Sequence, residues 1–417
     1  MIMFTSIAVF LFLAIALIIP GGVSVGPVLL LLGSAALLRK RDRPKLERGE
    51  IALIAVLVLY FLVGILTNLT HAAPLREYDS PARFLLAIPV LLLLRSFPPL
   101  PQFFWSGAVV GAISSGSYGA WQVFSVSGMR AAGHTNPIQF GNISLLLGIL
   151  CLAGLGWAAS QHRSVLWRVL MSCGIFFGLL GSLLSGSRGS WISLLIALPV
   201  AYFCHGGLLT WRHMAACVAT VLLLFGVLKA APPLPMEERI ELAVTETQDY
   251  IHSGTSTTSV GARLEMWRAG LLLIQERPWL GWGKDGYVRQ EDHLVQAGKI
   301  RLIPGAHNHL HNEYLDALVK RGLLGLAALL ALYLVPLVLF ARRVRDGNLA
   351  VRPYAVAGVL LIVCYMAFGL TQSFLTHNNG VMMLAFMLVI LWSLLRSSDA
   401  GAAATNGFPT IKTPSHP

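Results

Sequence analysis

Long apolar segments, separated by shorter polar ones, run along most of this chain of 417 residues. A helix needs about 20 mostly apolar residues to cross the hydrocarbon core of a bilayer, and the chain offers about twelve such segments. They lie at 3–19, 24–38, 51–69, 83–95, 103–119, 140–160, 167–184, 190–204, 212–229, 322–341, 354–371 and 380–395. The pattern predicts an all-α polytopic membrane protein, with transmembrane helices in 1–230 and 322–396.

The composition supports a membrane protein over a soluble one. Hydrophobic residues make up 56% of the chain and charged residues only 12%, and the mean hydropathy is +0.70. A soluble protein of this size needs a more highly charged surface. The net charge of +12 would suggest nucleic acid as the partner of a soluble protein. In a membrane protein, cytoplasmic loops and anionic lipid-linked substrates account for it, so we expect no nucleic-acid partner.

The Lys and Arg residues of the short loops predict the orientation. The 39–50 segment carries six of them and the 342–353 segment carries four. The positive-inside rule puts both in the cytoplasm, and an even number of spans then puts both termini there as well. We expect residues 1–20 to be a span, because they lack the basic start of a signal peptide. The 397–417 tail has the composition of a disordered cytoplasmic segment.

Residues 231–321 form the one long polar stretch, which this orientation places outside, in the periplasm of a bacterium with two membranes. Within it, residues 236–251 have an amphipathic helical pattern and 252–259 form a polar linker. A second amphipathic pattern follows at 260–276, with an apolar face that should lie at the membrane interface and place an indole at headgroup level. The residues of that face are Leu264, Trp267, Leu271 and Ile274.

His311 stands directly before the apolar helix predicted at 322–341. The dipole of a helix N-terminus disfavours the protonated imidazole, which keeps the ring able to accept a proton. A neutral histidine suits a general base that activates a hydroxyl group. Position alone favours the alternative, an interfacial histidine that bonds water or a carbonyl group.

Two groups of residues raise the question of a metal site. His307, His309 and His311 alternate along the chain, and imidazole is a common zinc donor. Glu77 and Asp79 form an acidic pair in an earlier loop, where solvated charges near arginines are the simpler reading. No carboxylate stands at an obvious ligating distance from the histidines, and the five cysteines have no metal-ligand spacing. We therefore expect no metal, no disulfide and no cofactor.

Two arginines are candidates for binding an anion. Arg188 lies in the turn Ser-Gly-Ser-Arg-Gly-Ser, where small neighbours let an anion reach the guanidinium and the backbone N–H groups. Arg263 opens the second amphipathic helix, a position that suits phosphate. Two guanidinium groups match a diphosphate. The alternatives are a snorkelling arginine at 188 and an exposed salt bridge from Arg263 to Glu265.

The C-terminal half carries four short motifs in a fixed order. They are Ser187-Arg188-Gly189, Arg263-x-x-x-Trp267, Pro278-x-x-Gly281-x-Gly283, and His311-Asn312-x-Tyr314-Leu315 followed by Gly322-Leu323-Leu324-Gly325. This ordered set resembles the O-antigen ligase and polymerase superfamily of bacterial membrane glycosyltransferases. The N-terminal half resembles the family only in hydropathy and in loose features such as Asn136-Pro137.

The resemblance implies a GT-C-like, metal-independent, inverting enzyme of the bacterial inner membrane, active at its periplasmic face. Such an enzyme moves a glycan from undecaprenyl diphosphate to a sugar hydroxyl of lipid A–core during lipopolysaccharide maturation. Carried onto this chain, it makes His311 the general base and gives the diphosphate to Arg188 and Arg263. The supporting residues are expected to be Asn312, Tyr314, Trp267, His309, Arg83 and Arg130.

Other activities share these motifs. An O-antigen polymerase and a protein O-oligosaccharyltransferase use the same chemistry on other acceptors, although one large outer loop late in the chain favours a ligase. A transporter of lipid-linked glycans would have charged groups inside its spans and a two-fold repeat, whereas these predicted spans are almost free of charge and show no repeat. A membrane scaffold gives no reason for His311, Arg188 and Arg263 to converge.

Overall fold

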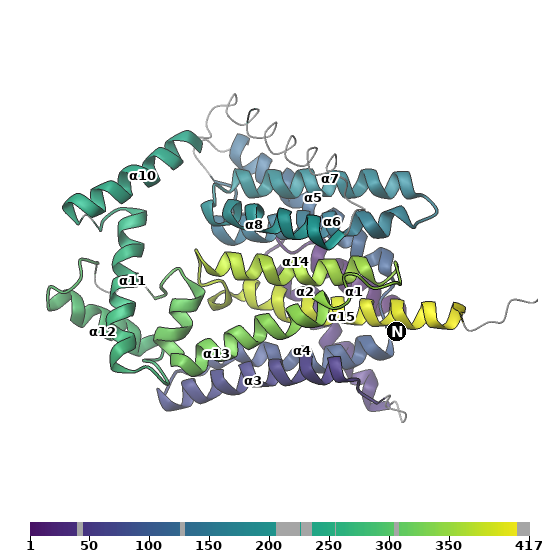
Figure 1. Ribbon diagram of the computed structural model, residues 1–417, viewed down its shortest axis with the longest axis horizontal. Coiled ribbons are helices and arrows are strands. Elements are labelled where there is room, and N and C mark those ends of the chain that lie inside the picture. Colours follow the sequence, from purple (N-terminus) through teal and green to yellow (C-terminus); the bar gives the residue numbers. More distant parts are fainter. Residues whose placement is uncertain are drawn as a thin grey trace, which may run out of the picture.

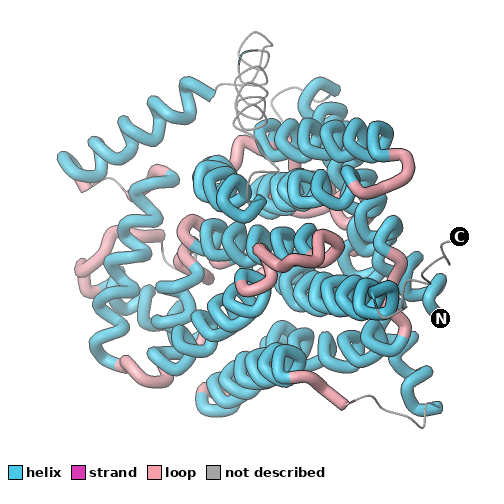
Figure 2. The backbone as a smooth tube through the Cα atoms, turned by 45° about the vertical axis from the view of Figure 1, so that its right-hand side comes forward, coloured by secondary structure: helices cyan, strands magenta, loops and turns pink. Residues whose placement is uncertain are grey.

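Helices joined by short loops make up the computed structural model of this protein (Figures 1 and 2). It describes residues 1–39, 45–125, 130–205, 226, 236–254, 256–303 and 308–406, and across these residues it contains no strand. Most of the span predicted at 212–229 and the end of the 397–417 tail lie outside the described residues. The all-α prediction is confirmed for the part of the chain that the structure covers.

Each of the other predicted spans overlaps a helix of one large bundle. Its helices are α1 (Ile2–Ala14), α2 (Gly22–Gly33), α3 (Arg48–Thr70), α4 (Asp79–Ser96), α5 (Pro101–Ser125), α6 (Pro137–Ala159), α7 (Ser164–Leu184), α8 (Arg188–His205), α13 (Glu313–Ala341), α14 (Arg352–Gly369) and α15 (Asn378–Asn406). Three short 3₁₀ helices, η1 (Ser34–Arg39), η2 (Leu75–Tyr78) and η3 (Phe374–Thr376), lie between them.

Six of these helices, α3, α6, α7, α13, α14 and α15, are long and apolar enough to cross a bilayer, and α1, α2 and α8 are shorter apolar helices. The chain is therefore an all-helical protein with several candidate membrane spans, and the number of about twelve stays a prediction. The N-terminus and the C-terminal end of α15 lie at the same end of the bundle (Figure 1). The position of these two parts of the chain at the same end agrees with an even number of spans. Which end faces the cytoplasm stays a prediction.

Small residues let the bundle helices approach closely. Between α6 and α7, Gly148 and Gly178 face one another, and a Cβ on Gly178 would lie only 2.7 Å from the Gly148 Cα. Ser144 Oγ donates a hydrogen bond of 3.1 Å to the Gly178 carbonyl beside this contact. Lipid chains are as apolar as leucine, so close packing and such hydrogen bonds hold spanning helices together.

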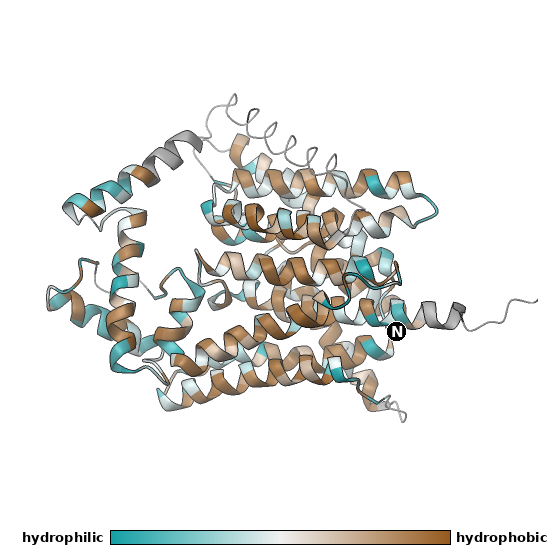
Figure 3. Cartoon of the chain, viewed as in Figure 1, coloured by the Kyte–Doolittle hydropathy of each residue, from teal (hydrophilic) through white to brown (hydrophobic). Residues whose placement is uncertain are grey.

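A second layer lies at the other end of the bundle (Figure 1). It consists of α10 (Met236–Ser253), α11 (Ser259–Glu276) and α12 (Lys284–Gln296), and it is more hydrophilic than the bundle (Figure 3). A separate apolar cluster that includes Met266, Leu273, Tyr287, Leu310 and Val319 joins α11 and α12 to the start of α13. The two helices predicted within 231–321 are confirmed, and their periplasmic location stays a prediction.

The face of α11 that packs into the protein differs from the apolar face predicted to lie at the membrane interface. Leu271 is 57% exposed, whereas Glu265, Met266, Ala269 and Leu273 are buried. A carboxylate lies on the buried face because Glu265 accepts hydrogen bonds from the Tyr250 hydroxyl (2.5 Å) and the Arg301 backbone N–H (2.8 Å). Hydrophobicity alone does not reveal such a satisfied buried carboxylate.

Trp267 has a partner inside the protein, and its place at headgroup level stays a prediction. Its indole Nε1–H donates to the Leu310 carbonyl (2.9 Å), and its ring packs against the cluster between α11 and α13. The tryptophan that is strongly exposed in this region is Trp279, at 71%. An indole with an internal acceptor no longer needs the polar interface to satisfy its N–H group.

Gly322 interrupts α13 with φ 64° and ψ −165°, backbone angles that are essentially restricted to glycine. The break leaves backbone groups without partners in the helix, and the motif that begins at Pro278 supplies new ones. The Leu323 N–H donates to the Pro278 carbonyl at 2.7 Å. In the other direction, the Trp282 N–H donates to the Val319 carbonyl at 2.9 Å.

The glycines of both motifs allow this join to form. A Cβ at Gly322 would collide with the Trp279 backbone, and a Cβ at Gly281 would collide with the Lys320 carbonyl carbon. Gly281 and Gly283 also have positive φ angles, of 65° and 67°. The Pro-x-x-Gly-x-Gly motif is thus explained by its backbone join to the broken helix.

We expect Gly322→Ala to destabilise the protein, because an L-residue at these angles costs about 1–3 kcal/mol before the collision with Trp279 is counted. The purified variant should unfold at a lower temperature in detergent than the wild type. Gly156→Ala is the matched control, since its Cβ would meet nothing closer than 3.6 Å. Equal unfolding midpoints for the two variants would contradict this account.

Candidate functional site

His311 lies immediately before α13, which begins at Glu313. Asn312 caps the helix: its side-chain carbonyl accepts hydrogen bonds from the N–H groups of Tyr314 (3.0 Å) and Leu315 (3.1 Å). The His311 backbone adopts φ 50°, which is rare outside glycine. A residue held in such a conformation needs firm support from its surroundings.

That support comes from side chains that grip the loop before α13. Trp267 holds the Leu310 carbonyl, while Asp316 Oδ1 accepts a hydrogen bond of 3.0 Å from the Leu310 N–H. Lys320 Nζ donates to the Asn308 carbonyl at 2.8 Å and pairs with Asp316 at 2.7 Å. The loop is therefore fixed from both α11 and the first turns of α13.

Gln372 fixes the ring of His311. The His311 Nδ1 lies 2.5 Å from Gln372 Oε1, and Gln372 Nε2 lies 2.9 Å from Nε2 of His377. A side-chain carbonyl oxygen can only accept a hydrogen bond, so Nδ1 carries a proton, and in the neutral ring Nε2 is the basic nitrogen. The Gln372 amide in turn donates to His377.

Gln372 and His377 are not among the site residues predicted from the sequence. Gln372 is 61 residues beyond His311, in the short connection between α14 and α15. The one available signal was that polar residues cluster in this connection between two apolar helices. Nothing in the sequence indicates which histidine they face.

His309 packs edge-on against His311, with ring centroids 4.1 Å apart, and lies 5.6 Å from the ring of His377. Burial, followed by the nearby His311, lowers the pKa of His309 to about 3. Burial also lowers the pKa of His377. Both rings are therefore neutral near pH 7.

The residues that raised the question of a metal have other contacts. Glu77 pairs with Lys284 at 2.7 Å, and Asp79 bonds Arg83, with Nε 3.2 Å from Oδ1. His307 lies outside the described residues. Among those that are described, no three His, Cys, Asp or Glu side chains are arranged to hold a metal ion.

The structure brings Arg188 and Arg263 near one another. Arg188 opens α8 and Arg263 lies in the first turns of α11, and both side chains are partly buried. Burial and then the positive charge of Arg188 lower the pKa of Arg263, while Glu246 opposes them. Two partly buried like charges are unfavourable together, and a bound anion would relieve the repulsion.

The Ser/Gly turn before α8 is fixed against the connection that holds Gln372. Arg130 Nε donates to the Ser185 carbonyl at 2.7 Å, so Arg130 positions this turn. A Cβ on Gly189 would collide with the Thr371 hydroxyl, so the start of α8 lies directly beside the residue before Gln372.

These contacts join the three main candidates. Arg188 is next to Gly189, which packs on Thr371, and Gln372 bonds His311. Arg263 is one helical turn before Trp267, which bonds the residue preceding His311. These contacts bring the His311 loop, the start of α8 and the first turns of α11 together at one end of the bundle.

Asn312 and Tyr314, at the start of α13, support the site by bonding the end of α14. The Tyr314 hydroxyl donates to the Met366 carbonyl at 2.8 Å, and Asn312 Nδ2 lies 3.3 Å from the Leu370 carbonyl. Both contacts tie the beginning of α13 to the end of α14. These two residues position the helix that follows His311.

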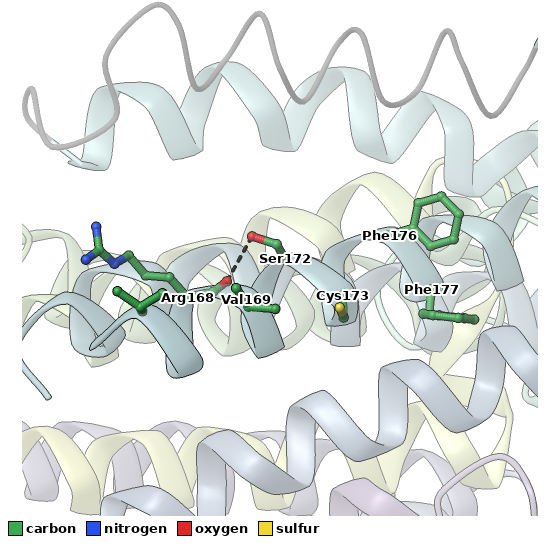
Figure 4. A pocket seen from close by; sticks show the side chains of 7 residues that line it. Arg168, Val169, Ser172, Cys173, Phe176 and Phe177 are labelled. Carbon is green, nitrogen blue, oxygen red and sulfur yellow. Dashed lines mark hydrogen bonds between the residues drawn. The ribbon is translucent and has the colours of Figure 1, made fainter. Parts of the chain in front are cut away.

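Arg83 lies apart from the arginine pair, in a polar cavity of about 490 Å³ that His377 also lines. A groove of about 560 Å³ on α7 contains none of the predicted site residues (Figure 4). Its lining is Val165, Arg168, Val169, Ser172, Cys173, Phe176 and Phe177. The polar cavity is therefore the one of these two that belongs to the candidate site, because Arg83 and His377 line it.

Comparison with known proteins finds similarity to the same family that the sequence motifs resemble. The O-antigen ligase family model matches residues 173–330. An uncharacterized protein of Haemophilus influenzae is 28% identical over 378 residues, which cover 90% of this chain and 94% of that protein. An O-antigen ligase of Escherichia coli is 24% identical over 197 residues, 46% of this chain and 44% of that one.

The family match contains Arg188, Arg263 and His311, and it ends before the connection that carries Gln372. The chain aligns with less than half the length of the Escherichia coli ligase. The segment that holds the candidate site, residues 173–330, is thus a match to the O-antigen ligase family, as its ordered motifs indicate.

Proposed function

We propose that this protein is an O-antigen ligase, which transfers a glycan from undecaprenyl diphosphate to a hydroxyl group of a lipid A–core sugar. The observation that carries the proposal is His311, with its Nδ1 bonded to Gln372, close to the partly buried pair Arg188 and Arg263. The family match over residues 173–330 supports it. We place the reaction at the periplasmic face of the inner membrane, with both termini in the cytoplasm.

Each side chain has a defined task in this reaction. His311 Nε2 accepts the proton of the acceptor hydroxyl as its oxygen attacks the anomeric carbon. The bond from that carbon to the diphosphate breaks, and the charge left on the diphosphate is stabilised by Arg188 and Arg263. A single displacement of this kind inverts the anomeric centre. The diphosphate is already a good leaving group, so orientation, deprotonation and charge stabilisation suffice.

Gln372 has a positioning role in this scheme. Its carbonyl oxygen accepts from Nδ1–H whether or not Nε2 carries a proton, so the ring keeps its orientation throughout the step. The amide is uncharged and therefore stabilises an imidazolium less than a carboxylate would. A neutral partner suits a base that must later release its proton.

Two related activities differ only in the acceptor. A polymerase would extend a second lipid-linked glycan, and a protein O-oligosaccharyltransferase would modify a hydroxyl side chain. Purified protein given the lipid-linked donor together with lipid A–core, with donor alone, or with an acceptor protein separates the three by product. Product that forms only in the mixture of donor and lipid A–core supports the ligase. Product that forms only in one of the other two mixtures supports the corresponding alternative activity instead.

His311→Ala should reduce transfer by about 10²–10⁴-fold, because the acceptor hydroxyl loses its base. Binding of the lipid diphosphate donor should be retained. His252→Ala is the control, since that exposed histidine of α10 bonds its own helix at the Gln248 carbonyl. A variant that loses donor binding along with transfer would give His311 a structural role instead.

Arg188→Ala and Arg263→Ala should each lower kcat/KM for the donor by about 10–100-fold, the loss of one strong charged hydrogen bond. Lys at either position should restore only part of the lost kcat/KM, because an ammonium group lacks the bidentate geometry of guanidinium. Arg268→Ala, an exposed arginine of the same helix α11, serves as the control. Full activity in either alanine variant would remove that arginine from the site.

Gln372→Glu should raise the pKa of His311 by about 1–3 units, because a carboxylate favours the imidazolium. The acid limb of the pH–rate profile should shift to higher pH by the same amount, and activity near neutral pH should fall. Gln372→Ala should lower kcat without that shift. A purely structural role for Gln372 predicts the same profile for both variants, with only the amplitude reduced.

A further inference from the structure

A polar cavity of about 490 Å³ lies beside the histidines and takes no part in the scheme above. Four segments distant in sequence line it: η2 with the start of α4, the start of α12, the loop at Asn308, and η3 with the start of α15. Hydrogen bonds from α3 and between the lining segments hold its walls. Asn68 Nδ2 donates to the Glu77 carbonyl at 2.8 Å, and Ser80 Oγ to the Leu375 carbonyl at 3.4 Å.

The charges that line the cavity balance. Three are cationic (Arg76, Arg83 and Lys284) and three are carboxylates (Glu77, Asp79 and Asp285). Glu77 pairs with both Lys284 at 2.7 Å and Arg76 at 3.4 Å, and Arg83 is bonded to Asp79. Such a lining has little net attraction for an anion, in contrast to the pair Arg188 and Arg263.

Balanced carboxylate, guanidinium and amide groups suit an uncharged ligand with many hydroxyl groups. A sugar hydroxyl both donates and accepts, so it can bond the carboxylates and the cationic N–H groups of the same wall. Asp79 is 60% exposed and keeps acceptor capacity beyond its bond to Arg83. The chemistry is therefore that of a saccharide site.

The cavity borders the histidine group directly. His377 lines it and bonds Gln372 at 2.9 Å, and Gln372 bonds His311 at 2.5 Å. Asn308 also lines it, three residues before His311 in the same fixed loop. A saccharide held in the cavity would contact His377, which is joined to His311 through Gln372.

We infer that this cavity binds the acceptor saccharide, the sugar whose hydroxyl attacks the lipid-linked glycan. The inference rests on the proposed transfer reaction and separates two substrates by charge. The diphosphate of the donor goes to the two arginines, and the uncharged part of the acceptor goes to the charge-balanced cavity.

The test uses the full-length protein in nanodiscs with Asp79→Ala and Arg76→Ala. KM for lipid A–core should rise about tenfold or more in each variant, the cost of one lost hydrogen bond to a charged group. KM for the lipid diphosphate donor and the unfolding midpoint should stay at wild-type values. Asp249→Ala, an exposed carboxylate of α10, is the matched control. An unchanged acceptor KM, or an equal rise for the donor, overturns the inference.

Direct binding separates this inference from the reaction itself. Soluble, deacylated core oligosaccharide should give saturation-transfer NMR signals with the wild type that weaken with Asp79→Ala. Binding that depends on Asp79 without any transfer would refute the ligase proposal and leave a saccharide site. Transfer to lipid A–core with binding unaffected by Asp79→Ala would refute the cavity and leave the ligase.

Discussion

The hydrogen bond between His311 and Gln372 depends on the packing of the whole site end of the bundle. It requires the loop before α13 to meet the connection after α14, and it holds a residue whose backbone is itself strained at φ 50°. Contacts from Trp267, Asp316 and Lys320 hold one side of this bond. The turn before α8 packs on the other side. The tautomer of His311 is thus set by tertiary structure.

The break in α13 also helps to hold the loop that carries His311. The break at Gly322 allows the first turns of α13 to run in a different direction from its apolar part. The Pro278 motif supplies hydrogen-bond partners for the backbone groups at the break. Those first turns carry Asp316 and Lys320, which grip the histidine loop. A helix that ran straight from Glu313 would lack this backbone join. The glycines that mark the family in sequence therefore support the site without touching the reacting atoms.

Charge divides the site into two regions. Arg188 and Arg263 are like charges in partly buried positions, an arrangement that is costly unless an anion is bound. The neighbouring cavity is equally polar, but each of its cations has a carboxylate close by. His309 packs on His311, and His377 lines the cavity and is joined to His311 through Gln372. The two regions thus differ in charge balance, and the proposed division of donor and acceptor between them follows from that difference.

The sequence alone determined the helical class, the apolar segments and the motif residues, because hydropathy and helix starts are local properties. It placed His311 before a helix and identified Arg188 and Arg263 as candidates, but it did not reveal that α11 packs into the protein through Glu265, Met266 and Leu273. Only tertiary structure decided that Gln372, 61 residues from His311, bonds the histidine, and that Asp79 and His377 share a cavity. Contacts between distant segments depend on how whole helices pack, and no local pattern records that packing.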